Sequence, residues 1–295
     1  MQVLTTRKQK FDQVTFSPEG TRLAAAGEDG AYLWTLTETT DPRVIGRGVA
    51  SGIGFVTGRD CLVVSTGLGG SVIHSLPGGT DHVIDIGYPV RVVTPCPTKP
   101  LVLLSQTMCE RVACVEVTAA GKGRVKWARG TKRVVSSSNP VFGPDGDWFA
   151  RVSADGGWHV SVTATATGKD RRSVDIGDAA LTPPAADPTN DRLVQYNAGK
   201  LIVNELSGDP FAFQWIIESG GRKHFTGVAF HPSGAYLAAT SNDEAVKIYD
   251  TATWQVARTF TWNVGRLRSV AFSPDGTRAA VGSDTGKVVI WDVDL

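Results

Sequence analysis

Residues 270–276 read Val270-Ala-Phe-Ser-Pro-Asp-Gly276, and close variants occur at 14–20 and 228–234. In each copy an apolar stretch leads into a turn that contains Pro and ends in Gly, which are the residues that a tight turn between two strands prefers. A fourth copy reads Val141-Phe142-Gly-Pro144-Asp-Gly146. A repeated unit constrains the fold more strongly than any single residue does, so internal repetition is the first property of this chain. Repetition of this kind favours binding over catalysis.

The repeat has a regular period. We anchor the units near residues 16, 55, 93, 142, 181, 230 and 272. Their mean spacing is about 43 residues, which is the length of a four-stranded propeller blade. Within the first unit, Arg22–Ala26 is small and apolar, as in a strand covered on both faces, and Ala31–Leu36 carries the aromatic residues. Val256–Phe260 is typical of a fourth strand, and no stretch shows sustained helical periodicity.

The third strand of several units ends in an aromatic residue followed by a polar one. In chain order the seven pairs are Trp34-Thr35, His74-Ser75, Val115-Glu116, Val162-Thr163, Asn204-Glu205, Tyr249-Asp250 and Trp291-Asp292. On these residues and the Ser-Pro-Asp-Gly turns the chain resembles the WD40-repeat family. The resemblance implies an all-β fold, a single seven-bladed propeller over residues 1–295 with four antiparallel strands in each blade. The Gly-His pair of that family is absent from every unit, so its side-chain hydrogen-bond network cannot be complete here.

The last unit lacks residues for a fourth strand, because the chain ends at Leu295 directly after the third. Gln2–Thr6 precedes the first unit and alternates as a strand does. We therefore expect residues 1–8 to supply the missing strand and to complete the last blade. Such closure removes exposed sheet edges, which otherwise promote aggregation.

Composition excludes several classes of protein. The chain has 295 residues, a net charge of +1 and four cysteines, which is too few for a disulfide framework. Cys61 and Cys114 lie in apolar runs and are expected to be buried thiols, while a Cys109–Cys114 pair stays open. Residues 1–10 do not form a secretory signal and no apolar stretch is long enough to span a bilayer, so we expect a cytoplasmic monomer without membrane contact.

Motifs for chemistry are missing. None of the five histidines has metal-ligand spacing, and no nucleophile or metalloprotease motif occurs. Gly67-Leu-Gly69-Gly70 is interpreted as a hairpin turn and not as a phosphate loop. The recurring Asp29, Asp155, Asp243 and Asp284 occupy one turn position in each unit, which indicates turn formation. We predict no enzyme activity, no cofactor and no metal; the alternatives are a propeller enzyme with an active site at the channel mouth, or a nucleic-acid-associated propeller.

Basic residues gather in the segments that precede the first strands. In a propeller blade these segments share one side with the turns between second and third strands, and we name this side the mouth face. Eleven of the 30 Lys and Arg residues lie in these segments: Lys8, Lys10, Arg47, Arg91, Arg129, Lys132, Arg133, Arg222, Lys223, Arg266 and Arg268. The aromatic residues Phe11, Tyr88, Phe225 and Trp262 are their neighbours, and the acidic hairpin turns reduce the charge.

This pattern predicts a surface for a protein or peptide partner that is acidic or phosphorylated, with arginine and aromatic side chains as anchors. The predicted partner-binding residues are Arg91, Lys132, Arg133, Arg222, Lys223, Phe225, Trp262, Arg266 and Arg268. The competing interpretation is that these loops are simply solvated. A nucleic-acid partner is disfavoured, because the chain lacks an overall basic excess.

Overall fold

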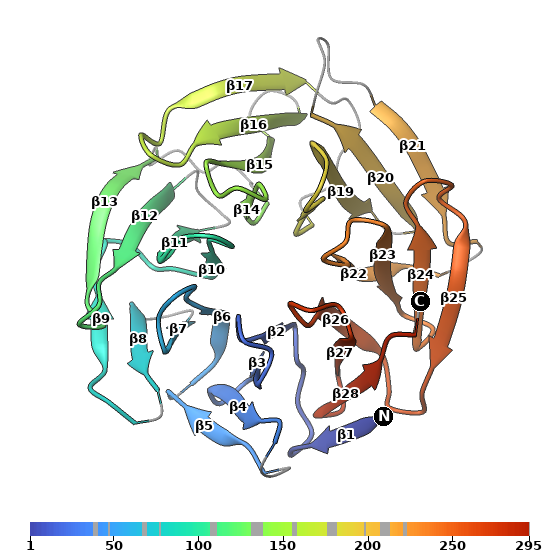
Figure 1. Cartoon of the computed structure of the whole chain (residues 1–295), viewed down its shortest axis with the longest axis horizontal. Helices are drawn as coiled ribbons and strands as arrows, with labels where there is room; N and C mark the ends of the chain where they lie inside the picture. The colour runs from blue at the N-terminus through green and yellow to red at the C-terminus, as the bar shows by residue number, and fades with distance from the viewer. Residues whose placement is uncertain are drawn as a thin grey trace. The chain divides into compact units, whose positions relative to one another are not determined.

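The computed structural model describes residues 1–37, 41–46, 48–66, 70–76, 78–106, 111–130, 138–154, 158–175, 182–197, 199–206, 213–220 and 223–294. In these ranges 28 strands form seven four-stranded antiparallel sheets, one per blade (Figure 1). This confirms the predicted seven-bladed all-β propeller. No helix in the described ranges has the length and apolar character needed to cross a membrane.

The residues group into two compact units, Met1–Ile45 with Ala185–Leu295, and Gly46–Pro184. The first unit holds blades one, five, six and seven, and the second holds blades two, three and four. One domain over residues 1–295 stays a prediction.

The strands of the first unit are β1 (Gln2–Thr5), β2 (Gln13–Phe16), β3 (Arg22–Ala26), β4 (Ala31–Thr35), β5 (Arg43–Ile45), β18 (Ala185–Ala186), β19 (Arg192–Asn197), β20 (Lys200–Glu205), β21 (Phe213–Glu218), β22 (Phe225–Phe230), β23 (Tyr236–Ser241), β24 (Ala245–Asp250), β25 (Val256–Thr261), β26 (Leu267–Phe272), β27 (Arg278–Ser283) and β28 (Lys287–Asp292). Those of the second unit are β6 (Ala50–Phe55), β7 (Cys61–Thr66), β8 (Ser71–Ser75), β9 (His82–Ile84), β10 (Val92–Pro95), β11 (Leu101–Gln106), β12 (Arg111–Val117), β13 (Gly123–Arg129), β14 (Val141–Phe142), β15 (Trp148–Ala154), β16 (Trp158–Ala164) and β17 (Asp170–Asp175).

The repeated turn forms as its residues predict. In blade one the Gly20 amide donates to the Ser17 carbonyl at 2.8 Å, and Gly20 has a φ of 69°, a conformation that only glycine adopts without strain. The Gly276 amide makes the same bond to the Ser273 carbonyl at 2.9 Å. This side of each blade, which carries the turn between first and second strands, is named the turn face.

Two of the sequence anchors are displaced. One backbone bond recurs in every blade, from the amide of the residue after the first strand to the carbonyl of the residue that begins the second. It places the equivalent of Phe16 at Phe55, Pro95, Phe142, Ala186, Phe230 and Phe272. The anchors near 93 and 181 therefore move to Pro95 and Ala186, because the turns between first and second strands begin with Cys96-Pro97 and Asp187-Pro188.

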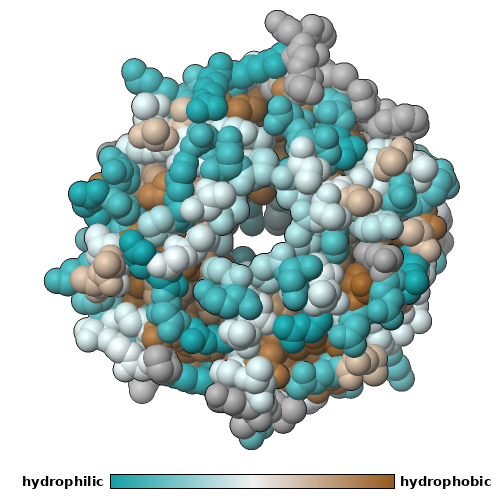
Figure 2. Space-filling view, viewed as in Figure 1, coloured by the Kyte–Doolittle hydropathy of each residue, from teal (hydrophilic) through white to brown (hydrophobic). Residues whose placement is uncertain are grey.

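The apolar core lies between neighbouring blades. Between blades seven and one, Trp34 and Phe11 are fully buried and their rings meet edge-on at 6.2 Å. Leu23–Ala26 of β3 is almost wholly buried, which fits a second strand covered on both faces. Figure 2, drawn in the same view as Figure 1, shows mainly hydrophilic side chains, in teal, on the surface, with apolar ones, in brown, visible between them. Within each unit, neighbouring blades thus share their apolar cores.

The N-terminal strand completes the last blade, as predicted. β1 pairs antiparallel with β28, and Leu4 lies opposite Val288. Leu4 is 1% exposed in the core between blades seven and one, whereas the adjacent Val3 is 39% exposed. The closure therefore contributes apolar burial in addition to backbone hydrogen bonds.

Replacing Leu4 by Ala is expected to lower the free energy of unfolding by about 2–5 kcal/mol, because the change leaves a cavity in a closed core. Urea unfolding measures it. Val3→Ala is the matched control on the same strand and is expected to change stability by less than about 1 kcal/mol, because it removes exposed surface. Equal effects of the two variants would contradict the closure of the last blade by β1.

Candidate functional site

On the mouth face of the first unit, basic side chains are held by acidic ones. Arg7 forms an ion pair with Asp29 at 2.6 Å, and Lys223 forms one with Asp243 at 2.7 Å. In both cases the cation precedes a first strand and the acid stands in the turn between second and third strands. The predicted sharing of this face by cations and acidic turns is therefore observed in blades one and six.

A bulge at the start of the first strand directs one residue of the blade toward its neighbour. In blade seven the register shifts between Leu267 and Ser269, and Arg268 lies at the shift. The Arg268 guanidinium forms an ion pair with Asp12, which lies at the start of blade one. The Ser269 hydroxyl donates to the Phe11 carbonyl at 2.9 Å. The same shift occurs in blade six between Phe225 and Gly227.

The residue just before the bulge points into the core. Phe225 is only 4% exposed and packs in the cluster between blades five and six, and Phe11 is fully buried. Phe225 is therefore a core residue, and a partner cannot contact it without opening the blade. Trp262 is half-buried: its ring lies 5.9 Å from Phe260 and 4.8 Å from Trp291. Of the predicted aromatic anchors in this unit, Trp262 keeps an exposed portion.

The other predicted residues divide by position. Arg266 is exposed at the beginning of blade seven, and Arg91 is exposed at the beginning of blade three, in the second unit. Lys132, Arg133 and Arg222 lie outside the described residues. The structure brings Arg266 and Arg268 together with Trp262 in one segment before β26, and each of these positions stays a predicted contact.

Blade three carries mouth-face residues that the sequence interpretation missed. Arg111 begins β12 opposite Gln106, and its guanidinium carbon lies 5.4 Å from the centre of the Tyr88 ring. Burial raises the pKa of the Tyr88 phenol, and the charge of Arg111 opposes that shift. Arg111 begins a third strand, whereas the predicted cations all lie before first strands or at their start. Basic residues at the start of third strands are the sequence signal that identifies it.

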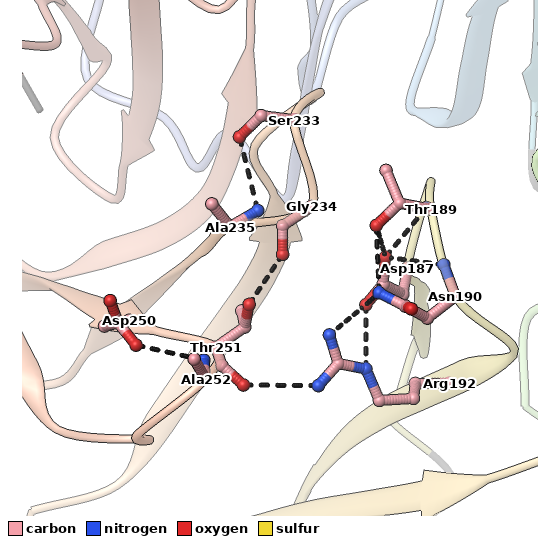
Figure 3. Close-up of polar contacts among 10 residues, drawn as sticks. All are labelled: Asp187, Thr189, Asn190, Arg192, Ser233, Gly234, Ala235, Asp250, Thr251 and Ala252. Atoms are coloured by element: carbon pink, nitrogen blue, oxygen red, sulfur yellow. Dashed lines mark hydrogen bonds and ion pairs between the residues drawn. The ribbon is translucent and has the colours of Figure 1, made fainter.

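The turn face carries a buried polar cluster in blades five and six (Figure 3). Asp187 is fully buried and accepts hydrogen bonds from Thr189 and Asn190, and its carboxylate pairs with Arg192 at 2.6 Å. The Arg192 guanidinium also donates to the Thr251 carbonyl of blade six at 3.2 Å and lies over the Trp254 ring at 5.6 Å. Both carboxylate oxygens of Asp187 are occupied by Thr189, Asn190 and Arg192, so this cluster is structural.

Links of this kind recur from one blade to the next. On the turn face of five blades a side chain donates to, or shares a hydrogen bond with, a turn carbonyl of the following blade. The pairs are Thr57 with Cys96, Thr98 with Asp145, Arg192 with Thr251, His231 with Gly276 and Arg278 with Gly20. The turn face thus carries hydrogen bonds that link neighbouring blades within each unit.

The described cysteines have structural roles. Cys61, Cys96 and Cys114 are buried and free, as predicted for Cys61 and Cys114, and Cys109 lies outside the described residues. Burial raises the pKa of the Cys61 thiol to about 11 and that of the Cys114 thiol to about 12, so both are protonated at neutral pH. Within the described ranges, no three His, Cys, Asp or Glu residues are placed to hold a metal ion.

Removing the Asp187 carboxylate with Asp187→Ala is expected to lower the free energy of unfolding by about 3–5 kcal/mol, because it leaves the Arg192 charge buried without a partner. Chemical denaturation measures this loss. The control is Asp12→Ala at the exposed pair with Arg268, for which about 0–1 kcal/mol is expected. A loss as small as that of the control would show that the Asp187 cluster does not stabilise the fold.

The Asp243 pair predicts a specific dependence on pH. Burial opposes ionisation of Asp243, but hydrogen bonds from Lys223 and Ser241 outweigh it and hold the pKa of that carboxyl below its ordinary value. The pair therefore stabilises the folded state fully above the ordinary Asp pKa of about 3.9, and this contribution is lost as the pH falls through the lowered value.

Comparing Asp243→Asn with the parent by urea unfolding across the acidic range checks this. The difference in unfolding free energy is expected to be constant near neutral pH and to shrink below about pH 4. A difference that is the same at every pH would show that the ion pair contributes no stability.

Comparisons with known proteins agree with this geometry. The family model "WD domain, G-beta repeat" matches residues 218–250 and 254–292, which cover blade six and most of blade seven. Among curated proteins, WD repeat-containing protein VIP3 of Arabidopsis thaliana is 35% identical over 82 residues, covering 23% of this chain and 26% of that protein. Actin-interacting protein 1 of Caenorhabditis elegans is 35% identical over 72 residues, covering 23% of this chain and 12% of that protein. The matched stretch is thus about a quarter or less of either relative's length.

A solved structure extends the likeness to the whole chain. The crystal structure of the Cps50 (Swd1) β-propeller domain of Myceliophteria thermophila superposes with a TM-score of 0.77 at 16% identity, covering 99% of each chain. At that identity the likeness shows the fold alone. Residues 218–250 and 254–292 thus match the WD40 repeat model, and the seven four-stranded blades have the fold of a β-propeller.

Proposed function

We propose that this protein is a non-catalytic interaction scaffold that docks an acidic or phosphorylated peptide or protein on its mouth face. WD40 propellers generally act as scaffolds for protein partners, and the curated relatives are WD repeat proteins. Three further statements remain predictions made from the sequence: the partner is not a nucleic acid, the protein is a monomer, and it is cytoplasmic.

The observation that carries the proposal is the segment before β26. Arg266 is exposed there, and in the part of the chain that the structure describes its side chain has no ion-pair partner. Arg268, whose side chain is 29% exposed, is held in place by Asp12. Side chains that are already ordered lose less conformational entropy when a partner binds. The exposed guanidinium of Arg266, the ordered guanidinium of Arg268 and the half-buried ring of Trp262 are the kinds of side chain that anchor partners at interaction surfaces.

The hydrogen bonds between blades on the turn face support the same proposal. Turn-face side chains such as Arg192 and Arg278 are committed to carbonyls of the next blade. In the mouth-face pair Lys223–Asp243 the Lys223 side chain is 49% exposed, so its ammonium group can also meet another anion from solvent. An acidic partner can therefore reach this ammonium group.

Replacing Arg266 and Arg268 together by Ala is expected to weaken binding of the natural partner by more than about tenfold, since a desolvated arginine anchor contributes about 1–2 kcal/mol or more. The partner is obtained by co-purification with the tagged protein from its native cell and identified by mass spectrometry. Binding to both forms is then measured by surface plasmon resonance. Thermal unfolding is expected to be almost unchanged, because exposed charges contribute little to stability.

The matched control removes two positive charges elsewhere, with Arg258→Ala on the exposed strand β25 and Lys169→Ala in an exposed turn of blade four. Arg278 is unsuitable as a control because it links blade seven to Gly20 of blade one. Equal partner affinity of the two double variants would show that the segment before β26 is solvated and not a docking surface.

A further inference from the structure

Three polar atoms at the mouth end of blade three are buried without hydrogen-bond partners among the described residues. They are the Tyr88 hydroxyl, the Ser105 hydroxyl and the Gln106 side-chain oxygen. Buried polar groups are nearly always hydrogen-bonded in folded proteins, so each exception requires an explanation. Two of the three, Tyr88 and Gln106, adjoin the same residue, Arg111.

The strand register places Gln106 beside Arg111, whereas the side chain of Ser105, the preceding residue, lies on the other face of the sheet. Ser105 and Gln106 end β11, and Gln106 lies directly opposite Arg111, the first residue of β12. On the other side of β11, the Arg91 amide donates to the Ser105 carbonyl at 3.0 Å. Paired strands lie about 4.8 Å apart, so Arg91, Gln106 and Arg111 span about two strand spacings. Tyr88 closes the group by stacking against the Arg111 guanidinium.

The charge of this group differs from that of the first unit. Within the described ranges neither Arg91 nor Arg111 forms an ion pair, whereas Arg7, Lys223 and Arg268 are each paired with an aspartate. The Tyr88 ring holds the Arg111 guanidinium in place through a cation–π contact. Two guanidinium groups that form no ion pair with the described residues, beside unpaired hydroxyl and amide groups, favour an anion that also offers a hydrogen-bond donor.

We propose that the mouth end of blade three binds an extended acidic peptide segment, whose carboxylate side chain is held by Arg111 and Arg91. Binding requires the Tyr88 hydroxyl and the Gln106 oxygen, both buried in the free protein, to become accessible; the hydroxyl then donates a further hydrogen bond to the carboxylate, and the Gln106 oxygen accepts a backbone N–H of the peptide. An extended chain presents both groups, because its side chains and backbone amides are close together. This inference rests on the proposed docking function and specifies its blade and its partner chemistry.

The test uses the full chain and a short fluorescein-labelled glutamate-rich peptide, with binding measured by fluorescence anisotropy. Arg111→Ala is expected to weaken binding by about tenfold or more, and Tyr88→Phe to weaken it less, because the phenylalanine ring retains the stacking. Arg111→Lys keeps the charge and most of the packing but loses the planar pair of donors, so intermediate binding is expected. Circular dichroism shows whether Arg111→Ala folds, and if it does not, Arg111→Lys takes its place in the test. Arg258→Ala is the control and is expected to bind as the parent does.

Several outcomes overturn the proposal. Absence of binding of the glutamate-rich peptide to the parent protein overturns it, and so does binding that Arg111→Ala and Arg91→Ala leave unchanged. Tight binding of a phosphoserine peptide with no binding of the glutamate peptide overturns the choice of a carboxylate. The two proposals can also fail independently. If Arg111→Ala loses peptide binding while the double variant of Arg266 and Arg268 still binds its natural partner as the parent does, the blade-three site is supported and the docking surface before β26 is not.

Discussion

The structure depends on the fact that a blade cannot bury its own faces. A four-stranded sheet with apolar residues on both sides has to be covered twice, and within each unit neighbouring blades cover one another. The second strands show this most clearly, because Leu23–Ala26 carries small side chains and is almost completely buried. Small residues there let the next blade approach closely. The same requirement explains why the last blade takes its fourth strand from Gln2–Thr5.

Apolar contact sets the distance between blades, and polar contact sets their register. On the turn face each hydrogen bond of the recurring series runs from one blade to the blade that follows it, as from Thr98 to the Asp145 carbonyl. These bonds join side chains to backbone carbonyls, so they tolerate variation of the accepting residue. This tolerance explains how blades with different residues, such as Asn204 in place of tryptophan, still pack as equivalent units.

The sequence predicted the features that depend on local chemistry. The Ser17–Gly20 turn, the buried Cys61 and the strand Gln2–Thr5 follow from residue preferences and spacing. Features that depend on a bulge were not predicted: simple alternation does not show that Phe225 points into the core. Pairing of Arg268 with Asp12 joins residues 256 positions apart, which no local pattern reveals. Blade five was misplaced by five residues because Pro183 and Pro184 resemble the turn that Pro188 actually forms.

The antiparallel pairing of β1 with β28 has a mechanical consequence. Gln2 lies opposite Ile290, and the amino group of Met1 lies 3.8 Å from the Asp292 carboxylate, so the chain enters and leaves the blade at the same end of this strand pair. A tension applied between the two ends would load the hydrogen bonds of the pair one after another, as in opening a zipper, and not all together as in shear. The last blade would therefore peel open at low force while the cores between the other blades are still intact.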